Sequence, residues 1–293
     1  MKKKFRIFMW DALDVLKTIP DQSVNLIVTS PPYFMGKDYD TSLKLDDFEE
    51  IHKAIFSDLY RILKTWGNLC WQVWYHTLNW EMVPLDCIVY NIIKEFNDNL
   101  KERDELLYLK NRIIWTFWHW LHSKKKFSWR HETILWYSKW KDWFFDLDSV
   151  RIPQKYPGKT YYKWEKKWQI SWNPLWKNPW DVREIPNVKA NHIEKTDHPC
   201  QFPVALVERL VKWLSPINGT VLDPFMWSWT SGVATLLHDR FFIWIELNEK
   251  YYNIALKRCE DTVEGKIKYR EDKPIYVPWK NLAVAKKPSF FKY

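Results

Sequence analysis

The sequence has 293 residues, of which 46% are hydrophobic and 28% charged, and this balance is typical of a globular protein with a substantial core rather than a disordered chain. No apolar run approaches the roughly 18 residues that cross a bilayer, and four scattered cysteines without a C-x-x-C pair argue against a zinc ribbon and a disulfide scaffold. The net charge of +9 favours a nucleic-acid partner. The lysine-rich start lacks the apolar stretch of a signal peptide, so a cytoplasmic protein is expected.

Predicted strands and helices alternate over the first 140 residues. Strands are expected at 5–9, 24–28, 69–73, 112–117 and 132–137, and helices at 12–18, 46–64 and 84–96. The helix over 46–64 is the clearest of them, because apolar residues recur at helical spacing behind an acidic first turn. Such alternation predicts an α/β fold of three layers around a mixed, mostly parallel sheet of about seven strands.

The pattern changes between residues 141 and 189, where lysines, aromatic residues and prolines follow no sustained period. We interpret this stretch as an irregular insert. Regular structure is expected to return with helices at 203–211, 231–237 and 249–258 and with strands at 220–222 and 241–245. The tail from 263 onward is basic and contains prolines, and it gives no clear prediction.

The first candidate site is Ser30-Pro31-Pro32-Tyr33, which follows the predicted strand at 24–28. Two consecutive prolines fix φ and remove two N–H donors, so the carbonyl groups of this turn are held outward at the carboxyl end of the strand. Open α/β sheets bind ligands at this edge. A hydroxyl, a fixed carbonyl and an aromatic ring can accept two hydrogens from an exocyclic amine and stack on its ring. The alternative is a plain strand-terminating turn.

A second candidate site follows the predicted strand at 220–222. Residues 223–230 read Asp-Pro-Phe-Met-Trp-Ser-Trp-Thr and join that strand to a helix through a tight loop, which is the arrangement of a nucleotide site. About 20 residues further on, an apolar strand ends in Glu246, where an acid can accept both hydroxyls of a ribose. Taken singly, Asp223 could be a helix cap and Glu246 a surface acid. Taken together, their spacing indicates a cofactor site.

In this order the motifs resemble those of bacterial DNA amino-methyltransferases of the circularly permuted beta class, in which the catalytic motif precedes the cofactor motif. Residues 30–33 match the family's S/D/N-P-P-Y/F motif, and residues 223–230 match its D-P-F-x-G-S-G-T loop at every position but two. Residues 198–203 match its H-P-x-x-x-P segment, and Arg130-His131-Glu132 resembles a motif late in the catalytic half.

The resemblance implies a Rossmann-like methyltransferase fold with S-adenosylmethionine as cofactor. It divides the chain into a catalytic half at 1–140, a target-recognition insert at 141–189, a cofactor-binding half at 190–262 and a basic tail at 263–293. The implied catalytic residues are Ser30, Pro31, Pro32 and Tyr33, and the implied cofactor residues are Asp11, Asp223, Pro224, Phe225, Trp227, Ser228, Trp229, Thr230 and Glu246. No metal ligand is expected.

The resemblance also implies a mechanism. A base inside a duplex cannot reach the methyl group, so the target base is flipped out into the pocket. Tyr33 would stack on the base, while the Ser30 hydroxyl and the Pro31 carbonyl accept the two amine hydrogens. The nitrogen lone pair is then aimed at the methyl group, and positioning rather than a covalent intermediate supplies most of the rate.

The sequence departs from the family at glycine positions. It contains 6 glycines and 22 tryptophans, whereas glycine ordinarily makes up about 7% of a chain. Trp227 and Trp229 stand where the cofactor loop of the family has glycine, and Trp10, Trp66 and Trp244 also stand at glycine-like positions. Because an indole adds bulk where the backbone must approach a ligand, the double change predicts a blocked methionine end of the pocket.

Two target bases and two classes of function stay open. Serine at the first catalytic position is commoner among cytosine-N4 enzymes, whereas the wider match at 34–37 and 198–203 favours adenine-N6, towards which we lean. The other class is a catalytically inactive DNA-binding protein.

The residues expected to contact phosphates in either case are Lys124, Lys125, Lys126 and Arg130. The expected partners are double-stranded DNA and a restriction endonuclease for the same site, and the chain is expected to be a monomer or homodimer.

Overall fold

The computed structural model describes residues 4–32, 45–100, 106–117, 123–154, 156–162, 165–171, 176–189, 192–196, 201–225 and 230–271. Within these residues one sheet of eight strands has the order β1-β10-β9-β2-β3-β7-β6-β8. The strands are β1 (Phe5–Phe8), β2 (Val24–Thr29), β3 (Leu63–Val73), β6 (Tyr108–Thr116), β7 (His131–Ser138), β8 (Val182–Glu184), β9 (Thr220–Asp223) and β10 (Phe241–Ile245). The predicted α/β fold with a mixed, mostly parallel sheet is confirmed.

The first five strands in this order are parallel, and β7 is the antiparallel one. β1 comes from the start of the chain but pairs with β10 near its end. β9 lies between β10 and β2, so the strand order reverses direction at the β9–β2 pair. A crevice at the carboxyl ends of two such strands is where open α/β sheets bind ligands.

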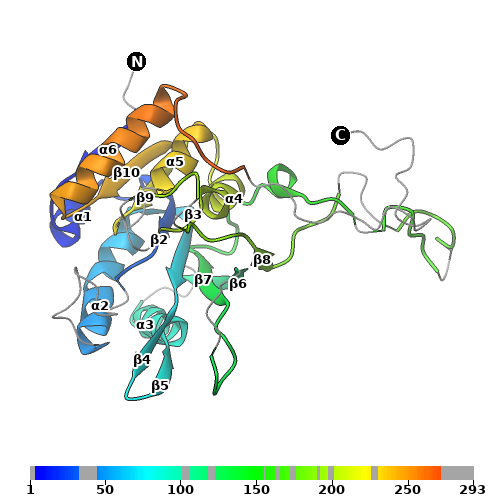
Figure 1. The fold of residues 1–293 in the computed structure, drawn as a ribbon, viewed down its shortest axis with the longest axis horizontal. Coiled ribbons are helices and arrows are strands. Elements are labelled where there is room, and N and C mark those ends of the chain that lie inside the picture. Colours follow the sequence, from blue (N-terminus) through cyan, green and yellow to red (C-terminus); the bar gives the residue numbers. More distant parts are fainter. Residues whose placement is uncertain are drawn as a thin grey trace.

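Helices cover both faces of the sheet (Figure 1). One hydrophobic cluster joins the sheet to α1 (Ala12–Thr18), α2 (Leu45–Ile62) and α3 (Leu85–Asp98). The other joins it to α4 (Val204–Leu214), α5 (Thr230–Leu237) and α6 (Glu249–Val263). The sheet is thus the middle of three layers. No helix among the described residues is both long and apolar enough to cross a membrane.

Two features differ from the sequence-based expectations. The chain forms an additional hairpin of β4 (Tyr75–Leu78) and β5 (Glu81–Pro84) between β3 and α3. Its strands have four residues each and mix polar with apolar side chains, so the sequence shows no clear period there. The predicted irregular stretch contains the short helix η2 (Asp148–Val150) and the edge strand β8, which pairs with β6. Between η2 and β8 the described residues extend away from the sheet (Figure 1).

Candidate functional site

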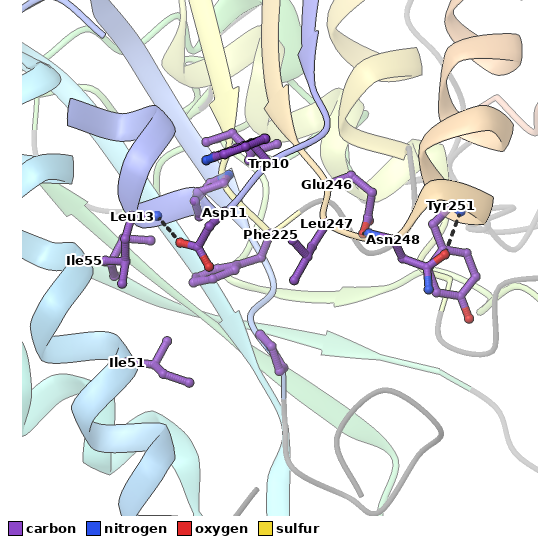
Figure 2. Close-up of a pocket in the computed structure, with 14 residues that line it drawn as sticks. Trp10, Asp11, Leu13, Ile51, Ile55, Phe225, Glu246, Leu247, Asn248 and Tyr251 are labelled. Carbon is purple, nitrogen blue, oxygen red and sulfur yellow. Dashed lines mark hydrogen bonds between the residues drawn. The ribbon is translucent and has the colours of Figure 1, made fainter. Parts of the chain in front are cut away.

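A pocket of about 470 Å³ opens at the carboxyl edge of the sheet, beside the point where the strand order reverses. Figure 2 shows its walls, which come from the start of α1, from α2, and from the segments that follow β2, β9 and β10. Apolar and acidic side chains line it, including Ile51, Ile55, Phe225, Asp11 and Glu246. A volume of this size and a mostly apolar lining with a few polar groups suit a small ligand of nucleoside size.

Asp11 contributes a carboxylate from the start of α1. It is the N-cap of that helix, and its Oδ1 accepts a hydrogen bond of 2.8 Å from the N–H of Leu13. The cap fixes the side chain at the pocket wall. The neighbouring Trp10, at a predicted glycine-like position, also lines the pocket and is 63% exposed. Its indole therefore enlarges one wall of the pocket without packing into the core.

Glu246 enters from the opposite wall, directly after β10. Its Oε1 accepts a hydrogen bond of 2.7 Å from the N–H of Asn248, so the chain turns around the carboxyl group and fixes it. Burial raises the pKa of Glu246 to about 7, against the opposing effect of the Asn248 and Leu247 N–H groups, and the negative charge of Asp223 raises it slightly further. A carboxyl group with a titration point this close to neutral is typical of a ligand site.

Asp223, at the end of β9, holds the crevice together. Its Oδ1 accepts from the Thr29 hydroxyl at 2.8 Å and its Oδ2 from the Ser231 hydroxyl at 2.7 Å. Desolvation by burial raises the pKa of Asp223 to about 6, although these two hydroxyls and the N–H of Phe225 favour the charged form. The side chain ties β9 to β2 and to α5, and it is the next two residues, Pro224 and Phe225, that line the pocket. Thr230 likewise points into the core, where its hydroxyl donates to the Phe202 carbonyl at 2.9 Å.

The catalytic turn predicted from the sequence begins at the same edge, one residue beyond β2. Ser30 and Pro31 are buried, and Pro32 lines the pocket. The turn and the pocket therefore share a wall. Four of the predicted site residues, Tyr33, Trp227, Ser228 and Trp229, lie outside the described residues.

Sequence reasoning missed a polar pair beside this turn, in which Gln72 is buried and Glu132 is partly buried. The Gln72 amide nitrogen near the end of β3 donates to Glu132 Oε2 at the start of β7, at 2.5 Å. Burial raises the pKa of Glu132 to about 7, against the opposing effect of this hydrogen bond. Glu132 belongs to the family-like motif at 130–132, but the sequence predicts no role for it. Gln72 stands out in the sequence only as a polar residue within an apolar strand.

The predicted phosphate-binding lysines lie on the connection between β6 and β7. Lys124, Lys125 and Lys126 are exposed, in a turn closed by the Ser123 hydroxyl, which accepts from the N–H of Lys126 at 3.3 Å. Arg130 lies at the base of this connection, half-buried. Because β6 runs parallel to β3 in the sheet and β7 runs the other way, the connection is at the carboxyl edge, the same edge as the pocket.

The aromatic residue Trp129 fixes the basic connection against the β4–β5 hairpin. Its ring lies 4.4 Å from that of Tyr75, measured between centroids, and its indole N–H donates to the His131 carbonyl at 2.7 Å. The hairpin, the basic connection and the catalytic turn thus all lie along the edge that holds the pocket.

These features define the class of protein. The sequence profile of a family of DNA methylases, N6_N4_Mtase, matches residues 24–257. The chain belongs to this family, so the enzyme is a DNA amino-methyltransferase, and the class predicted from the motifs is confirmed. The donor of the methyl group in this family is S-adenosylmethionine, as predicted.

Two curated relatives make the similarity more specific. The Type II methyltransferase M.BglII of Bacillus subtilis is 38% identical over 251 residues, which are 85% of this chain and 67% of that protein. The DNA adenine methyltransferase YhdJ of Escherichia coli is 30% identical over 255 residues, which are 85% of this chain and 81% of that protein.

Solved structures share the fold. The PvuII DNA methyltransferase, described as cytosine-N4-specific, superposes with a TM-score of 0.66 at 16% identity, over 89% of this chain and 92% of that one. The Thermus thermophilus protein TTHA0409, solved in complex with S-adenosyl-L-methionine, gives a TM-score of 0.61 at 22% identity, over 89% of this chain and 95% of that one.

The described residues fit this cofactor. The pocket combines an apolar slot, made by Phe225 and the two isoleucines of α2, with two carboxyl groups at its rim. An apolar slot suits a purine ring, and acids suit the donor groups of a ribose and of an exocyclic amine.

Proposed function

We propose that the chain is a site-specific DNA methyltransferase of a restriction-modification system that methylates the exocyclic N6 of adenine. The observation that carries this proposal is the shared wall of the pocket and the catalytic turn, because Pro32 belongs to both. A methyl donor held in the pocket is then next to the groups that would hold the target amine. The alternative within the same class is cytosine-N4.

Adenine is supported by the 30% identity to a relative named for that base, while the relative named for cytosine-N4 shares only the fold at 16% identity. A role in restriction-modification is supported by the Type II names of M.BglII and of M.ScaI from Streptomyces caespitosus, which is 33% identical over 87% of this chain and 81% of that protein. The partners that we propose are double-stranded DNA and an endonuclease acting on the same site.

Each residue has a proposed role in binding or positioning. Glu246 accepts hydrogen bonds from the ribose hydroxyls, Asp11 accepts one from the adenine amine of the cofactor, and Phe225 packs on the adenine ring. The bound cofactor supplies a methyl group on a positively charged sulfur.

Ser30 and Pro31 orient the amine of the flipped base. Two acceptors for its two hydrogens draw the nitrogen lone pair out of conjugation with the ring, so the lone pair points at the methyl carbon. With the cofactor bound, transfer of its methyl group to this nitrogen would release one of the two amine protons, which would pass to solvent water. The residues at 141–189 are proposed to select the DNA sequence, and Lys124, Lys125, Lys126 and Arg130 to bind phosphates.

The experiment that tests this proposal is identification of the methylated base. DNA treated with the protein and a labelled methyl donor is digested to nucleosides and separated. Label in N6-methyladenine supports the proposal, and label in N4-methylcytosine supports the alternative. DNA binding without any transfer would favour the inactive class, which rests on Trp227 and Trp229 in the cofactor loop.

A further inference from the structure

Three polar side chains form a row across the sheet at its carboxyl edge. Thr29 pairs with Trp71, so Ser30 follows β2 beside Gln72. Val28, Cys70 and Ile134 belong to one core cluster and so to one face of the sheet. Because side chains alternate along a strand, the residues two positions nearer the edge, namely Ser30, Gln72 and Glu132, lie on that same face.

The neighbours in this row are close enough to act together. Adjacent strands are about 4.8 Å apart, so the Gln72 side chain lies next to the proposed catalytic serine. Gln72 is 5% exposed, and its amide nitrogen is bound to Glu132. When Glu132 is ionised, its carboxylate accepts and does not donate, so the bond to the ionised form fixes which end of the amide is nitrogen and which is oxygen. It also leaves one more N–H on the same nitrogen.

We propose that Gln72 donates to the ring nitrogen beside the target amine, and that Glu132 positions the Gln72 amide for this contact. This inference rests on the proposed function. A base whose amine is held by Ser30 and Pro31 presents a ring acceptor next to it, N1 in adenine or N3 in cytosine, and a buried acceptor needs a donor. Gln72 is then a specificity-determining residue that tests for the amine and ring-nitrogen pattern shared by these two bases. Glu132 acts through Gln72.

The test compares two DNA duplexes that differ in one atom. One carries the normal target base, and the other carries its deaza analogue, in which C–H replaces the ring nitrogen. The test uses the protein with glycine at 227 and 229 as its reference. This reference protein is expected to methylate the analogue at least tenfold more slowly, because a hydrogen bond to a buried donor is lost. Gln72→Ala is expected to methylate both duplexes slowly and at equal rates, and Glu132→Gln to lose part of the discrimination because the amide is no longer fixed.

A merely structural role would give a different result. The melting temperature and the affinity for S-adenosylmethionine serve as controls. In Gln72→Asn, the conservative variant, the melting temperature is expected to be unchanged and the affinity to stay within twofold of the reference protein. If Gln72→Ala still discriminates between the duplexes by the same factor as the reference protein, the inference is wrong. If the reference protein with glycine at 227 and 229 binds DNA and S-adenosylmethionine but methylates neither duplex, it is the proposed function that fails.

A second inference rests on the backbone at tryptophan positions. Seven described residues other than glycine have φ between 48° and 79°, and three of them are tryptophans: Trp80 at 69°, Trp168 at 73° and Trp176 at 79°. The other four are Gln22, Asn79, Asn218 and Asp239. Asn and Asp tolerate this left-handed region, whereas a bulky side chain is a genuine outlier there.

Trp80 is the clearest case. Asn79 and Trp80 form the two-residue loop of the β4–β5 hairpin, and both have positive φ. Such loops strongly favour Asn-Gly. The Trp80 side chain is fully exposed, and that of Trp168 is 74% exposed, so burial of the indole does not compensate for the strain.

We infer that a subset of the tryptophan positions carry glycine in the cell that uses this protein. The chain has 22 tryptophans and 6 glycines, the reverse of ordinary usage. One codon, UGA, is read as tryptophan in some genetic codes and as glycine in others. A single difference in decoding therefore explains all the positions of this subset. Positions 80, 168 and 176 are assigned as glycine because their backbone is left-handed. Positions 227 and 229 are assigned as glycine because the family's cofactor loop has glycine there. Trp115 and Trp136 are assigned as true tryptophans, because their buried indoles donate to the Ile185 carbonyl at 2.7 Å and to Asn68 at 2.9 Å.

Peptide mass spectrometry of the protein isolated from its own cells tests this assignment directly. The expected result is glycine at 80, 168 and 176 and tryptophan at 115 and 136. Tryptophan at all three left-handed positions would overturn the inference. A stability measurement gives an independent check with matched variants: Trp80→Gly is expected to raise the melting temperature of the chain as written, whereas Trp115→Gly lowers it. A lower melting temperature for Trp80→Gly would contradict the backbone argument.

Discussion

Ser30 and Glu246 lie on different sides of the proposed reaction, one at the target amine and the other at the cofactor. Ser30→Ala removes an acceptor for the amine hydrogen, and loss of one such positioned group lowers transfer rates on the order of 100-fold. Affinity for S-adenosylmethionine is expected to change by less than twofold, because Ser30 is not among the residues that line the pocket. Labelled-methyl transfer and calorimetry measure the two effects separately. An equal loss of cofactor affinity would contradict this division of roles.

Glu246→Ala is expected to show the reverse pattern. Hydrogen bonds to a charged acceptor contribute roughly 1.5–3 kcal/mol each, so cofactor affinity should fall at least tenfold. The cofactor affinity of the protein with glycine at 227 and 229 should also depend on pH. Burial raises the pKa of Glu246 to about 7, and ribose hydroxyls favour the charged form, so affinity should rise with pH up to about 7 and stay constant above it. Calorimetry from pH 5.5 to 8.5 measures this slope, which Glu246→Gln should abolish. A Glu246→Ala effect below twofold would place this acid outside the site.

Trp227 and Trp229 are expected to determine whether this chain binds its cofactor. Each indole stands at a position where the family loop has glycine, and either one is expected to block the methionine end of the pocket. The double variant with glycine at 227 and 229 should therefore recover binding, whereas each single variant should recover little. Titration with S-adenosylmethionine measures all four proteins. Micromolar affinity of the chain as written would show that the loop accommodates both indoles.

At the scale of elements, the connection between β6 and β7 is expected to carry much of the affinity for DNA. Changing Lys124, Lys125 and Lys126 together to alanine should weaken binding equally for all sequences. It should also reduce the slope of log affinity against log salt by up to about 3, since each phosphate contact releases a counterion. The matched control changes Lys17, Lys257 and Lys266, which have similarly exposed side chains. Fluorescence anisotropy over a salt series measures both. An equal effect of the two triple variants would mean that the lysines act only through net charge.

Hydrophobic periodicity predicts the elements that build the three layers. The predicted helix at 46–64 is α2 at Leu45–Ile62, and the predicted strand at 241–245 is β10 with the same bounds. The hairpin at 75–84 was not predicted, because its turn reads Asn-Trp rather than Asn-Gly and its strands are short. β8 was missed because three residues of edge strand show no period and owe their structure to pairing with β6.

The sequence could predict those residues of the candidate site that directly follow a predicted strand. Glu246 and Pro32 line the pocket because each follows a strand that reaches the carboxyl edge. Asp223 is predicted as a cofactor residue, yet its carboxyl group bonds to Thr29 and Ser231, partners that only the strand order brings together. Gln72 and Glu132 were not predicted for the same reason, since their contact joins strands 60 residues apart in the chain.

In the whole molecule, distant parts of the chain meet at a single edge. β2, near the start of the chain, lies beside β9 from its last third, and the Thr29–Asp223 hydrogen bond joins them at 2.8 Å. The basic connection and the hairpin extend that edge on the side of β3 and β7. A duplex lying along this edge could therefore contact the lysines while one flipped base enters beside the cofactor.

Transfer of a labelled methyl group to DNA, followed by identification of the labelled nucleoside, tests the central claim most directly. The protein for this measurement carries glycine at 227 and 229, so that the cofactor loop matches the family motif. We predict label on an exocyclic amine, as N6-methyladenine, with this protein, and its loss when Ser30→Ala is added. Label at a ring carbon of cytosine, or undiminished transfer by Ser30→Ala, would contradict the account.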